Sequence, residues 1–416
     1  MDIRRTVQKI LPLALSIPFF WIALVMEGCD LFPDTPPENE VFDAPLDGLT
    51  GTQMSLHLAG DEEFGRRFTT GEGVGPIFIA TSCDACHPGE ARGHPTFDVV
   101  RFGRMDGNVF DPMIAQGGPQ LQNRSIPGYP AEEIPSGATG IARLTPPSVT
   151  GLGFLEAVDD ATIWAMADPD DADGDGISGR PQLIEESDLI AEIVAQSHLV
   201  DNGTRNIPVG GRYIGRFGKK GVSINLLHQT VSAYIEDMGL TTDLIPNDLT
   251  NVQEVGSAGE DTVPDPEISS SIVSNVVFYL RTLRQPLRRN ENDPDVRAGE
   301  QLFEQIKCTS CHVPTLETGV SNIPQLSEKE FHPYTDLLLH DMGSELDDGF
   351  TEGRATTSEW RTPPLWGLGL AEPFQGGRAY YLHDGRATSL EEAIQFHGGE
   401  ASGTRAAFNA LSEAEK

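Results

Sequence analysis

Two copies of the motif Cys-x-x-Cys-His, at residues 83–87 and 308–312, constrain this chain of 416 residues more than any other feature. The two-residue gap places both sulfurs at the edge of a porphyrin, where they form thioethers with the vinyl groups, and the histidine that follows binds the iron as proximal ligand. A redox dithiol would favour a βαβ setting, which the sequence does not show, and zinc would need four ligands for each site. The sequence therefore predicts two covalently bound haems c, held by Cys83, Cys86 and His87, and by Cys308, Cys311 and His312.

The N-terminal segment has the pattern of an export signal. Three basic residues, Arg4, Arg5 and Lys9, precede an apolar run over residues 10–26 that leads to Cys29. Cys29 stands where a bacterial lipoprotein signal is cleaved and the new N-terminal cysteine is lipidated. A plain cleaved signal and an uncleaved anchor are the alternatives. We expect a location in the periplasm or cell envelope, with attachment to a membrane through a lipid on Cys29.

The number of cysteines argues against a structural disulfide, and the net charge argues against a nucleic-acid partner. Of the five cysteines, four belong to the two motifs and the fifth is Cys29, so none is left for a structural disulfide. Lys and Arg number 29 against 63 Asp and Glu, which gives a formal net charge of −34. The phosphates of nucleic acid would be repelled by such a chain, so we expect no nucleic-acid partner.

Helical periodicity dominates the folded part of the chain. Apolar residues recur at helical spacing in the segments 226–239 and 270–283, and a further helix is expected over residues 62–68, before the first motif. No alternating strand run of comparable strength occurs. The polar, proline-bearing segment 284–295 indicates a domain boundary.

The two halves also share spaced signatures. Phe78 and Phe303 each stand five residues before the first cysteine of a motif, and Thr-Pro-Pro follows each motif, from Thr145 and from Thr362. We expect each phenylalanine to lie on the N-terminal helix that packs against the haem. The prediction is a mainly α fold of tandem cytochrome c-like haem domains, with long loops and little sheet. Its parts are a signal (1–29), a flexible tether rich in proline and acid (30–44), a first haem domain with a calcium-type loop and a helical insertion (45–290), and a second haem domain (291–416).

The residue on the opposite face of each iron decides between an electron carrier and a catalyst, because a second strong ligand blocks chemistry there. His397 and Met342 are the candidates for the second haem. For the first haem, His94 is the best of several weaker candidates.

In residues 171–176, aspartate stands at every second position and is followed by Gly176, which permits a tight turn. Calcium-binding loops have this pattern. The twelfth position holds Gln182 where an EF-hand has a bidentate glutamate, so the segment is either a looser calcium site, closed by Glu185 or Glu186, or an acidic turn. The predicted calcium ligands are Asp171, Asp173, Asp175 and the carbonyl of Ile177.

Other polar residues near the motifs have two interpretations each. Arg143, Arg361 and Arg386 either contact haem propionates and polarise a bound peroxide, or form ordinary ion pairs. His383 belongs to a network at the haem edge or to an ordinary turn. Glu156 is a distal acid–base residue or a buried carboxylate at a helix start.

Taken together, these motifs and the sequence around them resemble the bacterial di-haem oxidoreductase family, a family of predicted peroxidases that is also labelled thiol oxidoreductase. The resemblance covers about residues 45–412 and runs through GPIFIATSCDACH, RLTPPSVTGLGFLEA, DPDDADGDGISGRP, CTSCHVPT, PYTDLLLHDMG, EWRTPPLWGLG and YLHDGRATSLEEAIQFHGGEA. One departure is GRFGKKG, since we expect an aromatic residue after GRFG.

This family is similar to bacterial cytochrome c peroxidase, in which the histidine of an HDG block is followed, fourteen residues later, by the methionine ligand of the electron-transferring haem. Fourteen residues after His383 stands His397, so the resemblance implies a bis-histidine second haem. It also implies a calcium ion between the haem domains.

The function implied by the resemblance is that of an oxidoreductase. Its second haem would take electrons from a small donor protein, such as a cytochrome or cupredoxin, or from a quinol chain. The catalytic first haem would reduce hydrogen peroxide or another small oxidant, with Glu156 and Arg143 as the catalytic candidates. The alternatives are a non-catalytic electron-transfer or haem-sensing lipoprotein, and the oxidation of a protein or thiol substrate.

Overall fold

A computed structural model describes residues 41–107, 109–197, 204–254 and 261–416. These described residues belong to one compact unit. The predicted signal, the lipidation site at Cys29 and most of the tether lie outside the described residues. Among the residues described, no helix is both long and apolar enough to cross a membrane.

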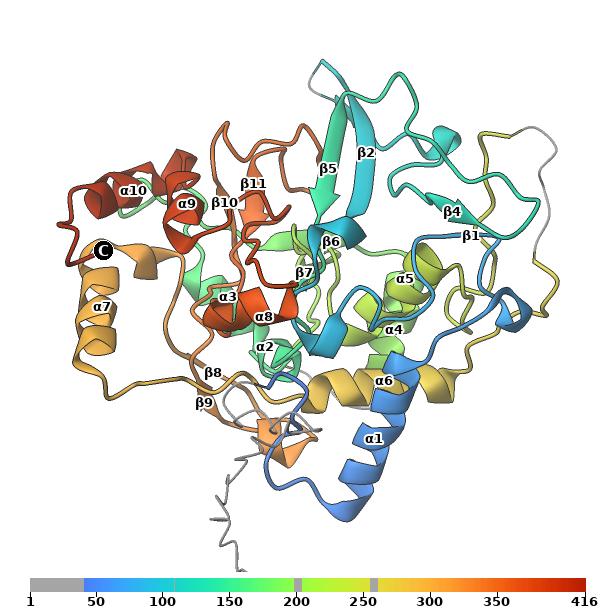
Figure 1. Ribbon diagram of the computed structural model, residues 1–416, viewed down its shortest axis with the longest axis horizontal. Coiled ribbons are helices and arrows are strands. Elements are labelled where there is room, and N and C mark those ends of the chain that lie inside the picture. The colour runs from blue at the N-terminus through green and yellow to red at the C-terminus, as the bar shows by residue number, and fades with distance from the viewer. Residues whose placement is uncertain (1–40, 108, 198–203, 255–260) are drawn as a thin grey trace, which may run out of the picture. The chain divides into compact units, whose positions relative to one another are not determined.

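Helices account for 32% of the chain and strands for 14%, in small sheets, so the predicted excess of helix over sheet is confirmed (Figure 1). The α-helices are α1 (Gly51–Gly65), α2 (Leu152–Glu156), α3 (Asp160–Met166), α4 (Asp188–Ser197), α5 (Leu226–Met238), α6 (Ser270–Thr282), α7 (Pro294–Gln305), α8 (Ala371–Phe374), α9 (Leu390–Gln395) and α10 (Ser402–Asn409). The predicted helices at 226–239 and 270–283 are α5 and α6, with ends one residue earlier. The segment 62–68 contributes only its first half to a helix, because α1 ends at Gly65 and the chain turns extended at Arg66.

The strands pair antiparallel in sheets of two or three. The three-stranded sheet has the order β3 (Val109–Asp111), β2 (Val99–Asp106), β5 (Gly140–Leu144). The two-stranded sheets pair β1 (Ile77–Phe78) with β4 (Arg124–Ser125), β6 (Gln182–Glu185) with β7 (Arg212–Gly215), β8 (Leu316–Glu317) with β9 (Glu330–Phe331), and β10 (Leu339–Asp341) with β11 (Glu359–Arg361). We did not predict β2, whose eight residues include Gly103 and two arginines and so carry a weak alternation signal.

The apolar core is continuous across the predicted boundary at 284–295. It includes buried side chains of α1, α5 and α6, such as Phe64, Tyr234 and Tyr279, and side chains after the second motif, such as Phe331. The rings of Phe154 and Phe331 lie 5.3 Å apart between centroids. The division into tandem cytochrome c-like domains therefore stays a prediction. Cys83 of the first motif and Val313, the residue after the second motif, pack against the same core.

A buried ion pair fixes the segment between α2 and α3. Arg216, which is 1% exposed, pairs with Asp160 and also donates to the carbonyls of Leu155 and Val158, at 3.2 and 2.5 Å. The second carboxylate oxygen of Asp160 accepts from the amide of Ile207 at 2.8 Å. Because this one guanidinium joins the chain after β7 to two helices, we expect it to be important for stability.

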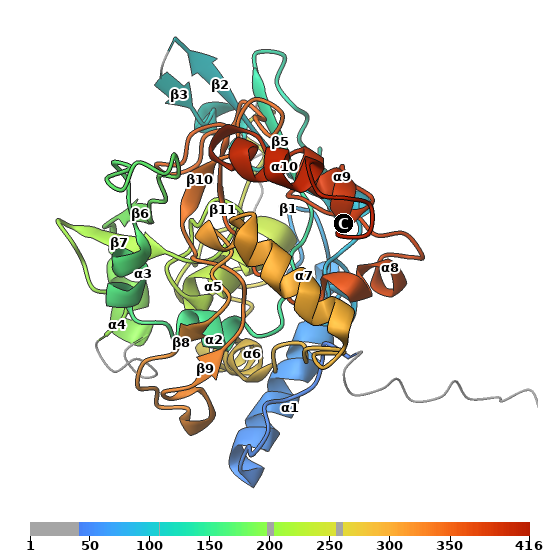
Figure 2. The ribbon, with the colours of Figure 1, turned by 90° about the vertical axis from the view of Figure 1, so that its left-hand side faces the viewer.

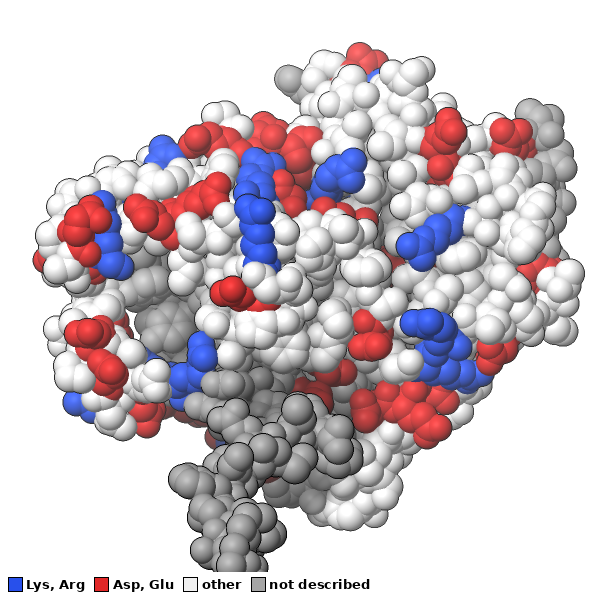
Figure 3. Space-filling view, viewed as in Figure 1, with Lys and Arg blue, Asp and Glu red and all other residues white. Residues whose placement is uncertain are grey.

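The C-terminal helices lie near the helix that leads into the second motif. In both ribbon views α7 runs below α9 and α10, at the same edge of the described residues (Figures 1 and 2). Acidic side chains are scattered over the face in Figure 3, and only a few basic ones lie between them, as the net charge requires.

Candidate haem sites

Both motifs fold into the same turn. The amide of His87 donates to the carbonyl of Cys83 at 3.0 Å, and the amide of His312 donates to the carbonyl of Cys308 at 2.9 Å. None of the four motif cysteines forms a disulfide. Burial raises the pKa of Cys83 and of Cys86 to about 12, and that of Cys308 to about 11. A redox dithiol requires a lowered thiol pKa, so these cysteines do not fit that alternative.

The two motif histidines are oriented in the same way. The Nδ1–H of His87 donates to the carbonyl of Pro147 at 2.7 Å, and that of His312 donates to the carbonyl of Tyr334 at 3.0 Å. Burial lowers the pKa of each to about 4, so both rings are neutral at physiological pH, with Nε2 left as an acceptor. A second partner that fixes the tautomer is typical of histidines that bind iron through Nε2. The residues present therefore fit haem iron.

Each proximal histidine lies near a phenylalanine, but the first one is not the predicted residue. Phe303 lies on α7, as predicted, with its ring centroid 6.2 Å from that of His312. Phe78 lies in strand β1, so its predicted place on a helix is wrong. Phe64 on α1 takes that position, 6.3 Å from His87. The longer connection between α1 and the first motif explains why a fixed spacing to the cysteine did not find Phe64.

His397 lies close to the second motif. Its Nδ1–H donates to the carbonyl of Ala393 at 2.8 Å, the same arrangement as in His87 and His312. Burial lowers the pKa of His312, and the charge of His397 lowers it further, so the two imidazoles are neighbours. Met342, the alternative ligand, stands in the loop after β10. The carbonyl oxygen of Met342 would lie 2.9 Å from a Cβ atom placed on Gly398. Both candidates thus belong to touching segments, and only His397 has a ring whose orientation leaves Nε2 free.

Within the described ranges, the hydrogen bond from Nδ1 to a backbone carbonyl occurs in His87, His312 and His397 and in no other histidine. His94 has its Nδ1 engaged by Thr96 and its ring against Tyr380, at 4.8 Å between centroids. These contacts favour a structural role for His94.

Lys219, which sequence reasoning did not single out as a site residue, lies near the first motif. It is the residue after GRFG at which we expected an aromatic side chain. Burial lowers the pKa of its amine well below the ordinary range, and the neighbouring Arg92 and Arg361 add to the effect. Its charge also contributes to the lowered pKa of His87. A basic group thus stands beside the first site at the position where we expected an aromatic residue, and that difference could have indicated it.

The two predicted catalytic residues, Glu156 and Arg143, differ in their exposure to solvent and in their partners. Glu156 ends α2, and its carboxylate pairs with Arg281 and accepts from the amide of Leu226 at 2.8 Å. Despite burial, these partners lower its pKa. Arg143 is exposed on β5 and interacts with Asp98. The acid–base role of Glu156 stays a prediction, and its ion pair counts against that role.

His383 and Arg386 lie in one turn but make different contacts. Arg386 pairs with Asp384, with 2.6 Å between Nε and Oδ2, and lies 5.6 Å over the ring of Phe396, next to His397. His383 stacks on Trp360 with 3.6 Å between ring centroids. Burial, with Arg386 adding to it, lowers the pKa of His383 to about 2, so this ring stays neutral.

The Trp360–His383 stack links the surroundings of the two motifs. On one side, Trp360 is the register partner of His340, whose Nδ1 lies 3.6 Å from the sulfur of Cys311. On the other side, the carbonyl of His383 accepts from the amide of Thr145 at 2.8 Å, two residues before the carbonyl that holds His87. Closely packed groups therefore join one site to the other.

The acidic loop after α3 forms a carboxylate cluster with a different membership from the predicted one. Oxygens of Asp168, Asp171 and Asp173 lie within 4.8 Å of one another. Asp175 instead accepts from the amide of Ile177 at 3.0 Å and faces Lys307 at 3.9 Å. The third carboxylate of the cluster is therefore Asp168, and not Glu185 or Glu186 as we had considered. We did not anticipate it because it stands before the alternating pattern.

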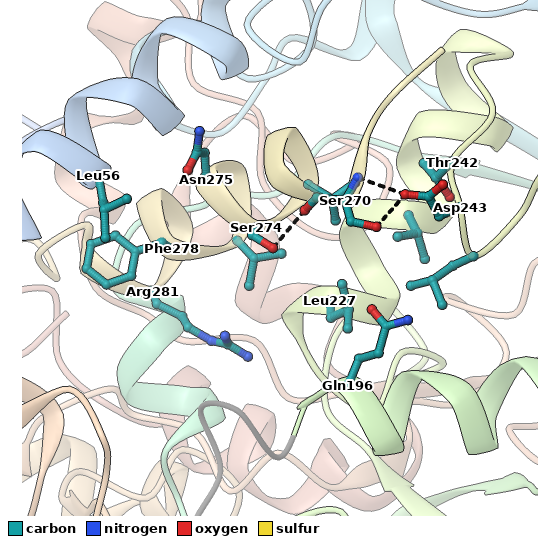
Figure 4. Close-up of a pocket in the computed structure, with 14 residues that line it drawn as sticks. Leu56, Gln196, Leu227, Thr242, Asp243, Ser270, Ser274, Asn275, Phe278 and Arg281 are labelled. Carbon is teal, nitrogen blue, oxygen red and sulfur yellow. Dashed lines mark hydrogen bonds between the residues drawn. The ribbon is translucent and has the colours of Figure 1, made fainter. Parts of the chain in front are cut away.

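A pocket of about 290 Å³ lies away from both motifs, among α1, α5 and α6 (Figure 4). Ser270 donates to Asp243 at its rim, through its amide at 3.0 Å, and most of the wall is apolar. Its lining includes no residue of either motif.

Comparison with known proteins shows the family to which the chain is similar. Residues 139–416 match the family described as "Di-haem oxidoreductase, putative peroxidase"; the first motif precedes this range. No curated protein matches the chain. Among solved structures, hydrazine synthase from Kuenenia stuttgartiensis is similar over 99% of this chain and 100% of that one, with 14% identity. The TM-score is 0.34, too low for any conclusion.

The family match covers more than half of the chain, and it includes the second motif, His397 and the Trp360–His383 stack. Haem is therefore the cofactor of its class, in agreement with the orientation of the motif histidines. This chain belongs to the di-haem oxidoreductase family.

Proposed function

We propose that this protein is an exported enzyme that reduces hydrogen peroxide at its first haem, with electrons supplied through its second haem. The observation that carries the proposal is the asymmetry of the two sites. His312 has His397 as a neighbour with a free Nε2, whereas His87 has no such partner among the described residues. An iron with one open face can bind a small oxidant, and one with two strong ligands can only exchange electrons.

The chain's own residues would hold both haems and join them. The cysteines of each motif would form the thioethers, while His87 and His312 would bind iron through Nε2. When bound, haem supplies the iron centre at which a small oxidant is reduced. The Trp360–His383 stack supports electron passage, since it provides a compact route between the two motifs.

Asp98 supports the proton side of the proposal better than Glu156 does. Burial raises the pKa of Asp98 to about 6, near the pH at which a group can both accept and release a proton. Lys219, Asp384 and Arg143 are its charged neighbours, and Lys219 is also a neighbour of His87. Arg143 would then act with Asp98 at the first site.

Three further elements complete the proposal. The signal-like segment supports export, and Cys29 supports attachment to a membrane by a lipid. The Asp168–Asp171–Asp173 cluster supports a bound calcium ion. The acidic composition favours a basic electron donor, such as a small cytochrome or cupredoxin.

The test is peroxide reduction by the full-length holoprotein. We expect one equivalent of hydrogen peroxide, added anaerobically to the fully reduced protein, to oxidise both haems, because peroxide takes two electrons on its way to water. Stopped-flow absorbance at the Soret and α bands measures this. A spectrum that peroxide leaves unchanged would contradict the enzyme and favour the electron carrier.

Substitution of Asp98 refines the same experiment. Asp98→Asn is expected to slow the oxidation about 100-fold, the usual effect of losing an acid–base group, without altering the ferric spectrum. Asp106→Asn, an exposed residue at the far end of β2, is the matched control. Equal rates for the two variants would exclude Asp98 from proton transfer.

A further inference from the structure

His340 is buried between two carboxylates beside the second motif. Its ring is 3% exposed; Nε2 lies 2.8 Å from Oδ2 of Asp336, and Nδ1 lies 3.0 Å from Oε2 of Glu400. Both ring nitrogens therefore donate, which requires the imidazolium form. Although burial opposes it, hydrogen bonding to Asp336 and Glu400 raises the pKa of His340 to about 12. A charged ring held from both sides is a rigid link between two segments.

Glu400 accepts hydrogen bonds from two other segments, and it stands three residues after His397. Besides His340, its carboxylate accepts from the amide and hydroxyl of Ser178, at 3.0 and 2.7 Å, and from the amide of Asp341 at 3.4 Å. Ser178 follows the acidic loop, and Asp341 ends β10. One side chain thus attaches the His397 segment to two others.

The backbones of the same two segments are in direct contact. A Cβ placed on Gly398 would lie 2.9 Å from the carbonyl of Met342, and one placed on Gly343 would lie 2.5 Å from the amide of Gly399. Gly343 and Gly399 also have positive φ, of 75° and 50°. Only residues without a side chain permit this approach, so the two loops pack glycine against glycine immediately after His397.

We infer that His340 and Glu400 are positioning residues that hold His397 against the second haem. Their link, together with the glycine contact, fixes the short segment after α9, while the bond from His397 to Ala393 fixes the ring itself. His340 reaches the motif directly, with its Nδ1 3.6 Å from the sulfur of Cys311. This inference rests on the proposed function, in which His397 is the sixth ligand.

The test uses ferric full-length holoprotein with Glu400→Gln and, separately, His340→Gln. Each change removes one charge of the link and keeps a side chain of similar size. We expect His397 to be displaced from iron more easily, so that cyanide binds the second haem about tenfold faster in each variant. Stopped-flow absorbance and EPR, which distinguishes the two haems, measure the rate. Glu391→Gln, an exposed glutamate on α9, is the matched control and is expected to behave as wild type.

The outcomes separate the inference from the proposed function. If His397→Gly opens the second haem while both link variants match Glu391→Gln, the link does not position His397 and the inference is wrong. If His397→Gly leaves the second haem low-spin, the ligand assignment itself fails. Should a link variant not fold, Ser178→Ala removes only one donor to Glu400, and an unchanged cyanide rate there would also contradict the inference.

Discussion

Replacing His397 with glycine is expected to convert the second haem from low-spin to high-spin. The imidazole is the only candidate ligand at that site whose Nδ1 is engaged and whose Nε2 is left for iron. Removing it opens a coordination position, and added imidazole should restore the low-spin spectrum. Optical absorbance and EPR of the ferric protein provide the measurement.

Met342→Leu is the matched control for this substitution. Met342 stands in the loop that packs on Gly398, so it samples the same neighbourhood without the ring geometry of His397. We expect it to leave the spectrum unchanged. A high-spin second haem in Met342→Leu, with His397→Gly like wild type, would reverse the assignment.

The second large effect is expected on stability, from Asp160→Ala. This change leaves the guanidinium of Arg216 buried without its carboxylate, and breaking a buried pair by removing one partner costs about 3–5 kcal/mol. Denaturant unfolding of the holoprotein, followed by circular dichroism, measures the free energy of unfolding. Asp188→Ala, at the exposed first position of α4, is the control, with an expected loss below about 0.5 kcal/mol. Equal losses in the two variants would show that the Arg216 pair contributes little.

Local sequence features predicted the elements that depend on local chemistry. The helices α5 and α6 follow from apolar periodicity, and the two motif turns follow from covalent spacing, so a short window of sequence contains the necessary information. The family was also recognisable, because its blocks occur in order along most of the chain.

Features that depend on the path of the chain were not predictable in the same way. The match of Phe78 to Phe303 was a coincidence of spacing: the helix before the first motif ends at Gly65, far upstream of Cys83, whereas α7 ends at Gln305, close to Cys308. Only tertiary packing reveals Phe64 as the counterpart of Phe303.

The polar networks were missed for a related reason. The role of His340 cannot be predicted from its local sequence, because Glu400, one of its two partners, stands sixty residues later. Asp336 is only four residues away, yet that pair alone does not indicate a link to the His397 segment. Likewise, the ion pair of Glu156 joins it to Arg281 in α6, which stands 125 residues later in the sequence.

We propose that the two haems are inequivalent, the second closed by His397 and the first open to a small oxidant. EPR of the ferric full-length holoprotein, with both signals integrated, tests this most directly. We expect one high-spin and one low-spin haem per chain, with the high-spin signal lost on addition of cyanide. Two low-spin signals of equal intensity, neither changed by cyanide or peroxide, would contradict it.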